Sequence, residues 1–530
     1  MSELRRLARE ARLVVARLQG MRARVPEGPA LPVRDPWPGD PARGALLLRG
    51  QLEVQGSTRR LVPGGWAETD NPVLDAAAHG FGWLRDLRAL GTDAARARGR
   101  VLVADWLAAA VPAVARRPDV AGARVAAWLG HYDFVAASAE DAFRAGLMAR
   151  LVADARALAA ALPAEEIDAR GLTALKGLIA AAVALPDHQA FLTRALRFLP
   201  QEIGRQVLPD GCHAERSPGV QLAALQDLVE IRALLQASQT QPPAALAGAI
   251  ERMAPALRTM RHGDGGLALF NGTKEEGAGL IDLVLAQAGR GGRAAAGLPE
   301  GGFHRMQAGR SLIIVDGGAP PPRGLDRMAH AGTLAFEFSV GRERLIVNCG
   351  GAMAAGEAWR DASRASAAHS GVVIADTNSS ELMPGGLGRR PAHVEASRQE
   401  ANGAHWLEAS HDGYGPPFGA LVRRRLYLAE SGDDLRGEEA VEAATGQPFV
   451  VRFHLHPAVR ASLQGEGDSV LLRLPGGSGW QLRAEAGAAR LALEESVYLG
   501  GAEPRRGEQV VLACPADGPQ QVRWAISRVG

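Results

Sequence analysis

A short polar segment, Leu208–Pro218, concentrates residues that could do chemistry. It reads Leu-Pro-Asp-Gly-Cys-His-Ala-Glu-Arg-Ser-Pro and places acids, an imidazole and a cation close together. His213 could act as a base, Glu215 could orient that base, and Arg216 could hold a carboxylate through two parallel hydrogen bonds. The alternative is a capped turn between two helices, because Pro-Asp-Gly favours a turn and Ser-Pro favours a helix start.

A second polar segment, Arg261–Gly266, reads Arg-His-Gly-Asp-Gly-Gly. Gly-Asp-Gly is typical of a tight turn, from which His262 and Asp264 would project. His262 is therefore a second candidate base, and Asp264 a candidate substrate contact. The alternative is a turn with a purely structural role.

Two histidines in the second half of the chain suggest a metal site. His330 and His369 are far apart in sequence but could meet on adjacent strands, and Asn348 lies between them. Two imidazoles with an oxygen ligand suit zinc. Two histidines that are hydrogen-bonded separately would give the same pattern.

A fourth group of candidate residues lies on one face of a predicted strand. In Phe449–His456, Arg452, His454 and His456 share one face, and the apolar side chains point to the other. Such a face suits an anion or a metal, and it also suits a solvated face or one between domains.

The elements that must position these residues change in kind along the chain. The first twenty residues predict an amphipathic helix. Residues 26–65 are rich in Pro and Gly and predict an extended strap without helix, anchored by Trp37 and Trp66. From Asn71 the spacing of apolar residues predicts helices, with Asn71-Pro72 as a start, Gly91 as a stop, and Ser138 with Asp141 opening another helix.

The second half predicts strands. Leu334, Phe336, Phe338 and Val340 alternate with polar residues before a turn at Gly341, and the alternation recurs to the end without helical interruption. The expected fold class is α+β multidomain. The domains would span 1–70 (N-terminal helix and strap), 71–295 (helical hairpins) and 296–530 (antiparallel β-sandwich).

Composition bounds the function. The chain has 530 residues, 47% of them apolar and 22% charged, which is typical of a globular protein. Its net charge of +2 argues against a general nucleic-acid-binding surface. No segment reaches the length of a transmembrane helix. The three cysteines, Cys212, Cys349 and Cys514, are too far apart to indicate a disulfide framework.

The ordered motifs resemble the heparinase II/III family of polysaccharide lyases from about Pro36 onward. The motifs that carry the resemblance include Asp35-Pro-Trp-Pro-Gly-Asp40, Phe81-Gly-Trp-Leu-Arg85, Glu215-Arg-Ser-Pro218, Asp264-Gly-Gly-Leu-Ala-Leu-Phe-Asn271, His330-Ala-Gly-Thr-Leu-Ala-Phe-Glu-Phe338, Val347-Asn-Cys-Gly350, Ala368-His-Ser370, His411-Asp-Gly-Tyr414 and Arg452-Phe-His-Leu-His-Pro457.

The resemblance implies an incomplete (α/α) toroid followed by an antiparallel β-sandwich, with a site in the cleft between them. It also implies β-elimination on uronate-containing polysaccharides. That reaction needs a group that neutralises the carboxylate and a Tyr or His that removes the C5 proton. Some members support the site with zinc, so we expect no required cofactor but keep zinc open, with His330, Asn348 and His369 as ligands.

Carried over residue by residue, the resemblance implies a set of site residues. The expected catalytic residues are His213, Glu215, Gln221, His262 and His330, and the expected substrate-binding residues are Arg216, Asp264, Tyr414, Arg452, His454 and His456. Several positions depart from the family pattern. Val220 and Gln221 stand where a Tyr-His pair is expected, and Met328 replaces the first histidine of the motif that contains His330. Gly332 replaces the Asp of that motif, and Asn348 stands where metal-binding relatives carry Asp.

Two function classes follow. One is a lyase that acts on an acidic, uronate-containing polysaccharide or oligosaccharide; the other is a glycan-binding or envelope-associated protein of the same fold that has lost turnover, as Val220 and Met328 suggest. We expect no nucleic-acid partner and no integral membrane segment, and a homodimer is left open. The first twenty residues lack a signal-peptide pattern, which favours the cytoplasm, whereas the resemblance implies the cell envelope or periplasm.

Overall fold

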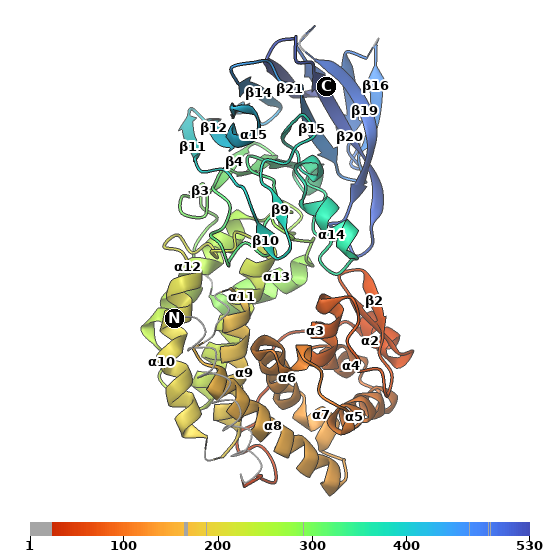
Figure 1. The fold of residues 1–530 in the computed structure, drawn as a ribbon, viewed down its shortest axis with the longest axis vertical. Helices are drawn as coiled ribbons and strands as arrows, with labels where there is room; N and C mark the ends of the chain where they lie inside the picture. The colour runs from red at the N-terminus through yellow and green to blue at the C-terminus, as the bar shows by residue number, and fades with distance from the viewer. Residues whose placement is uncertain are drawn as a thin grey trace. The chain divides into compact units, whose positions relative to one another are not determined.

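The computed structural model describes residues 24–163, 168–186, 188–289, 291–465, 467–485, 487 and 489–529. The helix expected in the first twenty residues lies outside this part of the chain. The described chain divides into two compact units (Figure 1). The first unit comprises the described residues of Met1–Gln206 together with Ala223–Ile250, and the second comprises Val207–Leu222 together with Glu251–Gly530.

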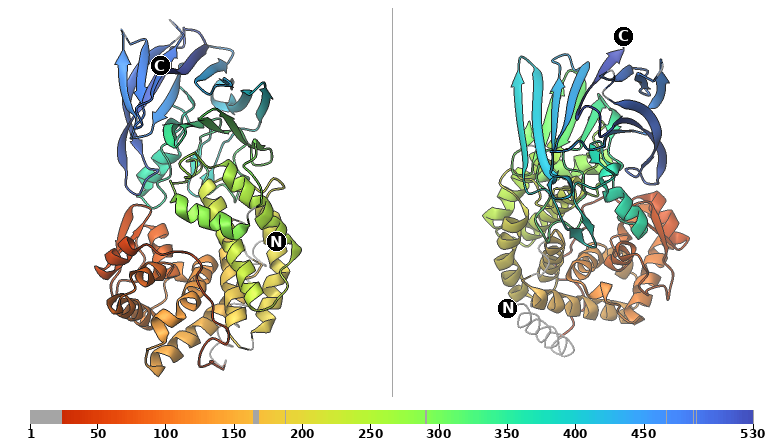
Figure 2. Two further views of the ribbon diagram at one scale, coloured as in Figure 1. Left: turned by 180° about the vertical axis from the view of Figure 1, so that it is seen from behind. Right: turned by 45° about the horizontal axis from the view of Figure 1, so that its top comes forward.

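The first unit is built mainly from helices, which follow one another around an open arc (Figure 2). In chain order its elements are α2 (Pro41–Leu48), β1 (Gln51–Val54), β2 (Ser57–Arg60), α3 (Pro72–Gly80), α4 (Leu84–Leu90), α5 (Asp93–Ala108), the 3-10 turn η1 (Val114–Arg116), α6 (Pro118–Gly130), α7 (Tyr132–Ala136), α8 (Asp141–Ala161), α9 (Arg170–Ala184) and α10 (Gln189–Gln206). Helices α11 (Pro218–Ala237) and α12 (Ala244–Thr259) have residues in both units.

Local sequence signals set several of these helix ends. The Asn71 side chain accepts hydrogen bonds from the first free backbone N–H groups of α3, and Pro72 occupies its first position, as predicted. Phe81 ends α3 and Gly91 ends α4, both in the left-handed conformation. The predicted helix after Asn71 is therefore two helices. Ser138 is not a cap, because α8 begins at Asp141 after Glu140.

The prediction that residues 26–65 contain no helix is wrong. Pro41–Leu48 forms α2, and its run of leucines is helical rather than extended. Asp40 caps the helix by accepting a hydrogen bond from Ala42 N, and Pro41 is tolerated because the first helical position needs no N–H donor. The predicted anchors of the strap, Trp37 and Trp66, are both buried.

The second unit is an antiparallel β-sandwich, as predicted. One sheet has the order β11-β12-β13-β14-β21-β18-β17-β16, and the other β19-β20-β15-β7-β6-β5-β4-β3, with β8 paired to β15. The strands are β3 (Gly297–Leu298), β4 (Phe303–Ala308), β5 (Ser311–Asp316), β6 (Phe336–Val340), β7 (Glu343–Val347), β8 (Val372–Ile374), β11 (Val394–Ala401), β12 (Ala404–Tyr414), β13 (Ala420–Leu428), β14 (Asp434–Glu442), β15 (Phe449–Leu455), β16 (Arg460–Gln464), β17 (Ser469–Arg473), β18 (Gly479–Ala484), β19 (Arg490–Tyr498), β20 (Arg505–Cys514) and β21 (Gln521–Val529), and a separate hairpin pairs β9 (Leu382–Met383) with β10 (Gly386–Leu387).

One hydrophobic core joins the two sheets. Phe336 and Phe338 of β6 pack with Trp524 of β21 and Trp480 of β18, so residues from both sheets meet between them. The alternation predicted for β6 is not visible in its burial, because all five of its residues are buried. The alternation of the sequence thus predicted strand β6 correctly. It did not predict that both faces of the strand are buried.

The expectation that no helix interrupts the second half is also wrong. The helices α14 (Glu357–Arg364) and α15 (Gly415–Phe418) and the 3-10 turn η2 (Ser366–Ala368) interrupt its strands. Helix α13 (Ala278–Ala288) also belongs to the second unit, but it falls in the stretch that the sequence predicts as helical. A bilayer-spanning helix is not found in the described part of the chain, because none of its helices is both long enough and apolar enough.

Candidate functional site

The segment Leu208–Pro218 forms a turn held by its own side chains. Gly211 adopts a left-handed conformation, and a Cβ there would lie 2.1 Å from the backbone oxygen of Arg252. Asp210 accepts hydrogen bonds from Cys212 N within the turn and from the backbone N–H groups of Glu300 and Gly301. The turn is therefore fixed to the start of the β-sandwich, within one unit.

Two predicted catalytic residues, His213 in the turn and Gln221 just after it, form hydrogen bonds with the backbone. Gln221 accepts a hydrogen bond from His213 N at 2.6 Å, and its amide nitrogen donates to Gly211 O and Met253 O. His213 is fully buried, and its Nδ1 accepts from Glu215 N at 3.2 Å. Both the oxygen and the nitrogen of the Gln221 amide therefore bind the backbone and stabilise the turn.

Arg216 connects the turn to the sandwich. Its Nε donates to Gly301 O at 2.7 Å, its Nη1 donates to Ala319 O at 2.8 Å, and its Nη2 pairs with Asp316 at the end of β5. The guanidinium lies over the Phe303 ring, 5.0 Å from its centroid. Burial raises the pKa of Asp316, and the charge of Arg216 opposes that rise.

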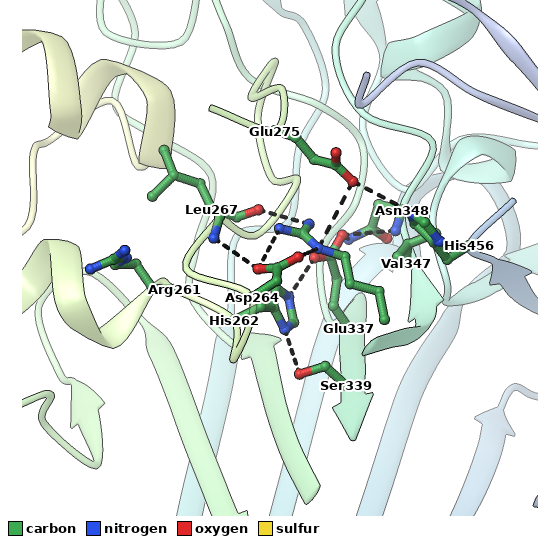
Figure 3. A network of polar contacts seen from close by, with 12 residues as sticks. Arg261, His262, Asp264, Leu267, Glu275, Glu337, Ser339, Val347, Asn348 and His456 are labelled. Atoms are coloured by element: carbon green, nitrogen blue, oxygen red, sulfur yellow. Dashed lines mark hydrogen bonds and ion pairs between the residues drawn. The ribbon is translucent and has the colours of Figure 1, made fainter. Parts of the chain in front are cut away.

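A second group of predicted residues lies in a polar network beside strands β6 and β7 (Figure 3). The Nε2 of His262 contacts Glu337 at 2.8 Å, and its Nδ1 contacts Ser339 at 2.9 Å. Arg344 donates from Nε to Asp264 at 2.8 Å and from Nη1 to Leu267 O at 2.9 Å. Burial lowers the pKa of His262, although its bond to Glu337 opposes that shift.

The network also includes Asn348 and Glu275, and Glu275 lies 3.9 Å from Arg344 Nε (Figure 3). Glu337 accepts from both the backbone and the side-chain nitrogen of Asn348. Glu275 accepts from the Tyr498 hydroxyl and lies 3.4 Å from His456 Nε2. Burial favours the neutral acid, but hydrogen bonds from His456 and Tyr498 and the charge of Arg344 lower the pKa of Glu275 to about 2.

His330 and His369 meet as predicted, but in loops rather than on adjacent strands. His330 Nδ1 lies 3.1 Å from His369 Nε2, and His369 Nδ1 lies 2.8 Å from Ala365 O. Because a carbonyl can only accept, His369 Nδ1 carries the proton, and its Nε2 accepts from His330 Nδ1. His330 Nε2 is left with a lone pair, is buried, and has no hydrogen-bond partner.

Asn271 places this histidine pair next to the turn. Its Nδ2 donates to Arg216 O at 2.7 Å, and its Oδ1 accepts from His330 N at 3.0 Å. Burial lowers the pKa of His369 to about 4 and that of His330 well below its usual value, so both rings are neutral near pH 7. A contiguous polar region therefore links the turn to the histidine pair.

The residues present do not fit the zinc site that the family resemblance implies. The third expected ligand, Asn348, accepts from Ser370 N through its amide oxygen and donates to Glu337 through its nitrogen. Among the described residues, no three His, Cys, Asp or Glu side chains converge as a metal site would require. Asn348 instead serves as a bridge between Glu337 and the loop that carries His369.

The remaining predicted substrate contacts, Tyr414, Arg452, His454 and His456, lie in the second unit. The Tyr414 hydroxyl donates to Val372 O at 3.1 Å, and burial raises its pKa to about 12. Arg452 reaches Gln509 at 3.2 Å. His454 bonds to Ala367 O and Ser496, and burial lowers its pKa to about 3. His454 N also donates to the Ser370 hydroxyl at 2.9 Å, and Ser370 N donates to Asn348, so His454 lies next to the loop of His369. His456 joins the network through Glu275.

Sequence reasoning missed the residues that connect the site, namely Asn271, Glu275, Asp316, Glu337 and Arg344. One signal was available, because Glu337 lies between two phenylalanines in a strand segment. A charge inside a buried strand has to find a partner. Which partner it finds depends on the tertiary fold and cannot be read from spacing.

Comparison with known proteins adds a family and a fold. The family model for the heparinase II/III-like C-terminal domain matches residues 290–525. The chain is 34% identical to the FtsZ-localized protein C of Caulobacter vibrioides (strain NA1000 / CB15N), over 95% of this chain and 91% of that protein.

Among solved structures, heparinase III superposes with a TM-score of 0.74 at 13% identity, covering 92% of this chain and 84% of that chain. The heparan sulfate lyase HepC from Pedobacter heparinus superposes with a TM-score of 0.60 at 15% identity, covering 98% and 88%. At these identities the likeness establishes the fold, while the activity of this chain depends on its own residues.

Proposed function

The chain belongs to the heparinase II/III family, and from that premise we propose that it acts as a binding protein that localises with FtsZ rather than as a polysaccharide lyase. The family is of the polysaccharide-lyase type, so the fold is compatible with turnover. The proposal rests on how this chain uses the residues that a lyase would need.

The observation that carries the proposal is that three of the candidate acid–base and neutralising groups, His262, Gln221 and Arg216, are bonded within the protein. Both ring nitrogens of His262 have side-chain partners, both ends of the Gln221 amide bind the backbone, and Arg216 is held by two carbonyls and Asp316. A base must reach the C5 proton of a bound uronate, either directly or through one water. Groups that are already engaged and buried stabilise the fold instead.

The departures from the family pattern favour the same reading. Val220 and Met328 stand where proton-transferring or metal-binding side chains are expected, and neither can take up a proton. The relative at 34% identity is named for its localisation with FtsZ, and this likeness spans almost the whole chain. We therefore extend the FtsZ association to this protein.

Two measurements test the proposal together. The purified full chain is sedimented with FtsZ assembled in GTP, and it is also incubated with a panel of acidic glycans while the ultraviolet absorbance of unsaturated uronides is followed. We expect co-sedimentation above that of an unrelated control protein and no absorbance increase. Failure to co-sediment would overturn the FtsZ association, and sustained product formation would overturn the non-catalytic role.

The second candidate is a lyase acting on a uronate-containing oligosaccharide, and His330 favours it. Its Nε2 carries a buried lone pair without a partner, beside Asn271, and its low pKa keeps it in the basic form near neutral pH. If the glycan panel yields product, His330→Ala should reduce turnover by roughly 100-fold or more, as expected for the loss of a general base. Turnover unchanged in His330→Ala would exclude His330 from that role.

A further inference from the structure

A large groove lies on the outer face of the eight-stranded sheet, away from the polar network described above. It has a volume of about 880 Å³ and is lined by residues of β11, β12, β13, β14, β18 and β21. This size falls in the range of small-ligand sites. Leu407, Leu426 and Leu435 of the same strands point to the core, so their neighbours in the sequence point to the groove.

Strand register aligns four charged residues across this face. Glu408 pairs with Arg425, Arg425 with Glu438, and Glu438 with Arg523, on four successive strands. The ion pairs measure 3.0 Å for Arg425–Glu408, 3.0 Å for Arg425–Glu438 and 2.9 Å for Arg523–Glu438. The result is a ladder of alternating hydrogen-bond donors and acceptors, each fixed by its neighbours.

An aromatic row runs beside the ladder, two residues along each strand. Trp406 stands opposite Tyr427, which stands opposite Arg436. The Trp406 and Tyr427 ring centroids are 5.2 Å apart, and the Arg436 guanidinium lies 6.0 Å from the Tyr427 centroid. Trp406 is 41% exposed although it is a large aromatic residue, so its ring presents apolar surface to whatever enters the groove.

A small residue leaves room on the floor of the groove. Ala525 lies between Arg436 and Arg483 in the aromatic row, because its strand pairs with β14 on one side and β18 on the other. Its methyl group does not fill the space between the two long side chains. The groove therefore continues from the aromatic pair toward β18.

The charges of the groove select the class of ligand. Four arginines and four glutamates line it, so its formal charge is balanced. A polyanion would meet the glutamates, and a polycation would meet the arginines. A sugar hydroxyl can donate to a carboxylate and accept from a guanidinium at the same time, so an uncharged polyhydroxylated ligand satisfies both.

We propose that this groove binds an uncharged oligosaccharide, with one sugar ring stacked on Trp406 and its hydroxyls bonded to Arg425 and Glu438. Aromatic rings offer a flat apolar face to the C–H face of a pyranose, and the ladder offers fixed polar partners beside it. This site is separate from the polar network at His262 and does not depend on FtsZ association or on lyase chemistry.

The test is calorimetric titration of the full chain with two neutral probes, the β-1,4 tetramers of N-acetylglucosamine and of glucose, and with one acidic probe, a hyaluronan tetramer. We expect at least one neutral tetramer to bind and the hyaluronan tetramer to bind more weakly. Trp406→Ala should weaken the neutral tetramer roughly tenfold or more, as the loss of an aromatic anchor does, and Trp406→Tyr should retain most of the affinity.

Leu463→Ala is the matched control, because Leu463 is 48% exposed on β16 of the same sheet but does not line the groove. It should bind the neutral tetramers as the wild type does.

Absence of binding by both neutral tetramers, stronger binding of hyaluronan, or equal affinity in Trp406→Ala would each overturn the proposal. A dimer in sedimentation that Trp406→Ala dissolves would also overturn it, because the groove would then be occupied by a second copy. Trp406→Ala should leave FtsZ co-sedimentation unchanged, which keeps this proposal distinct from the proposed function.

Discussion

Arg344 is the residue on which the polar network of the second unit depends. It is buried, and its guanidinium bonds to Asp264 and to the backbone oxygen of Leu267. Hydrogen bonding to Asp264 raises the pKa of Arg344 further, although burial opposes that rise. A buried charge is tolerated only while its partners remain, so each partner of Arg344 would be left unsatisfied by its loss.

The first prediction concerns this residue. Arg344→Met removes the charge at similar length, and we expect the free energy of unfolding to fall by about 2–3 kcal/mol, less than for a fully buried pair because Asp264 is partly exposed. Urea unfolding followed by circular dichroism measures this. Arg506→Met is the control, since the Arg506–Glu495 pair is 86% and 84% exposed and should unfold as the wild type does. Equal stability of the Arg344 variant would contradict the assigned role.

The second prediction concerns metal. Because His330 and His369 bond to each other and Asn348 is engaged on both sides, we expect the dialysed protein to contain no stoichiometric zinc. Elemental analysis after incubation with zinc and gel filtration checks this. One zinc per chain that disappears in His369→Ala and persists in His393→Ala, a variant of an exposed histidine, would show that the pair is a ligand set.

The sequence indicates which residues belong to the site more readily than it indicates which residues they bond to. A meeting of His330 and His369 was one of two alternatives that the sequence left open, and the two rings do meet. The partner of His262 is Glu337, and the two are separated by 75 positions, so only the folded chain brings them together. Gln221 was predicted to bind a substrate carboxylate. In the folded chain its amide nitrogen instead donates to the backbone oxygens of Gly211 and Met253.

At the scale of elements, local signals predict where helices begin but not how closely they pack. The start of α3 at Asn71-Pro72 and the end of α4 at Gly91 are set by capping chemistry within a few residues. The same chemistry operates at Asp40-Pro41, where the density of prolines around α2 obscured it. Helix α14 was missed because eight residues are too few for a periodic pattern to be distinguished.

The third prediction concerns the contact of α6 with α9, where two glycines cross. A Cβ on Gly177 would lie 2.3 Å from backbone atoms of Gly122, and backbone cannot move aside cheaply. Gly177→Ala should therefore lower the free energy of unfolding by roughly 1–3 kcal/mol through overpacking.

Gly146→Ala is the matched control in α8. Gly146 is exposed, and a Cβ there would meet one side-chain atom at an ordinary distance of 3.9 Å. This variant should gain about 0.5–1 kcal/mol from helix propensity. Urea unfolding of both variants checks the pair, and a stabilised Gly177→Ala would show that the helices are not in close contact there.

At the scale of the whole molecule, each of the two units holds several of its buried charges against opposite charges. In the first, Lys176 is bonded to Asp227 at 2.7 Å and Glu230 at 3.1 Å, and Arg124 is bonded to Asp154 at 2.7 Å. In the second, Arg424 is bonded to Glu439 at 2.8 Å. Buried histidines of the second unit are instead kept neutral, which makes the stability of the protein sensitive to acid.

The last prediction follows from these neutral histidines. Burial lowers the pKa of His369 and His411 to about 4 and that of His454 to about 3, while an unfolded chain titrates its histidines near 6.5. Between about pH 6 and pH 4 the unfolded state therefore binds more protons than the folded state. Stability is fully present above the unfolded pKa and is lost as the pH falls, at roughly 1.4 kcal/mol per pH unit for each histidine.

The free energy of urea unfolding, measured from pH 7 to pH 4.5, should fall by at least roughly 4 kcal/mol per pH unit at its steepest, because His369, His411 and His454 each contribute roughly 1.4 kcal/mol and the lowered pKa values of His79 and His330 act in the same direction. His454→Gln keeps a donor and an acceptor for Ala367 O and Ser496 but removes one titration, so its slope should be lower by roughly 1.4 kcal/mol per pH unit. A profile independent of pH over this range would mean that the buried rings are protonated in the folded protein, and the neutral His330–His369 pair would then have to be abandoned.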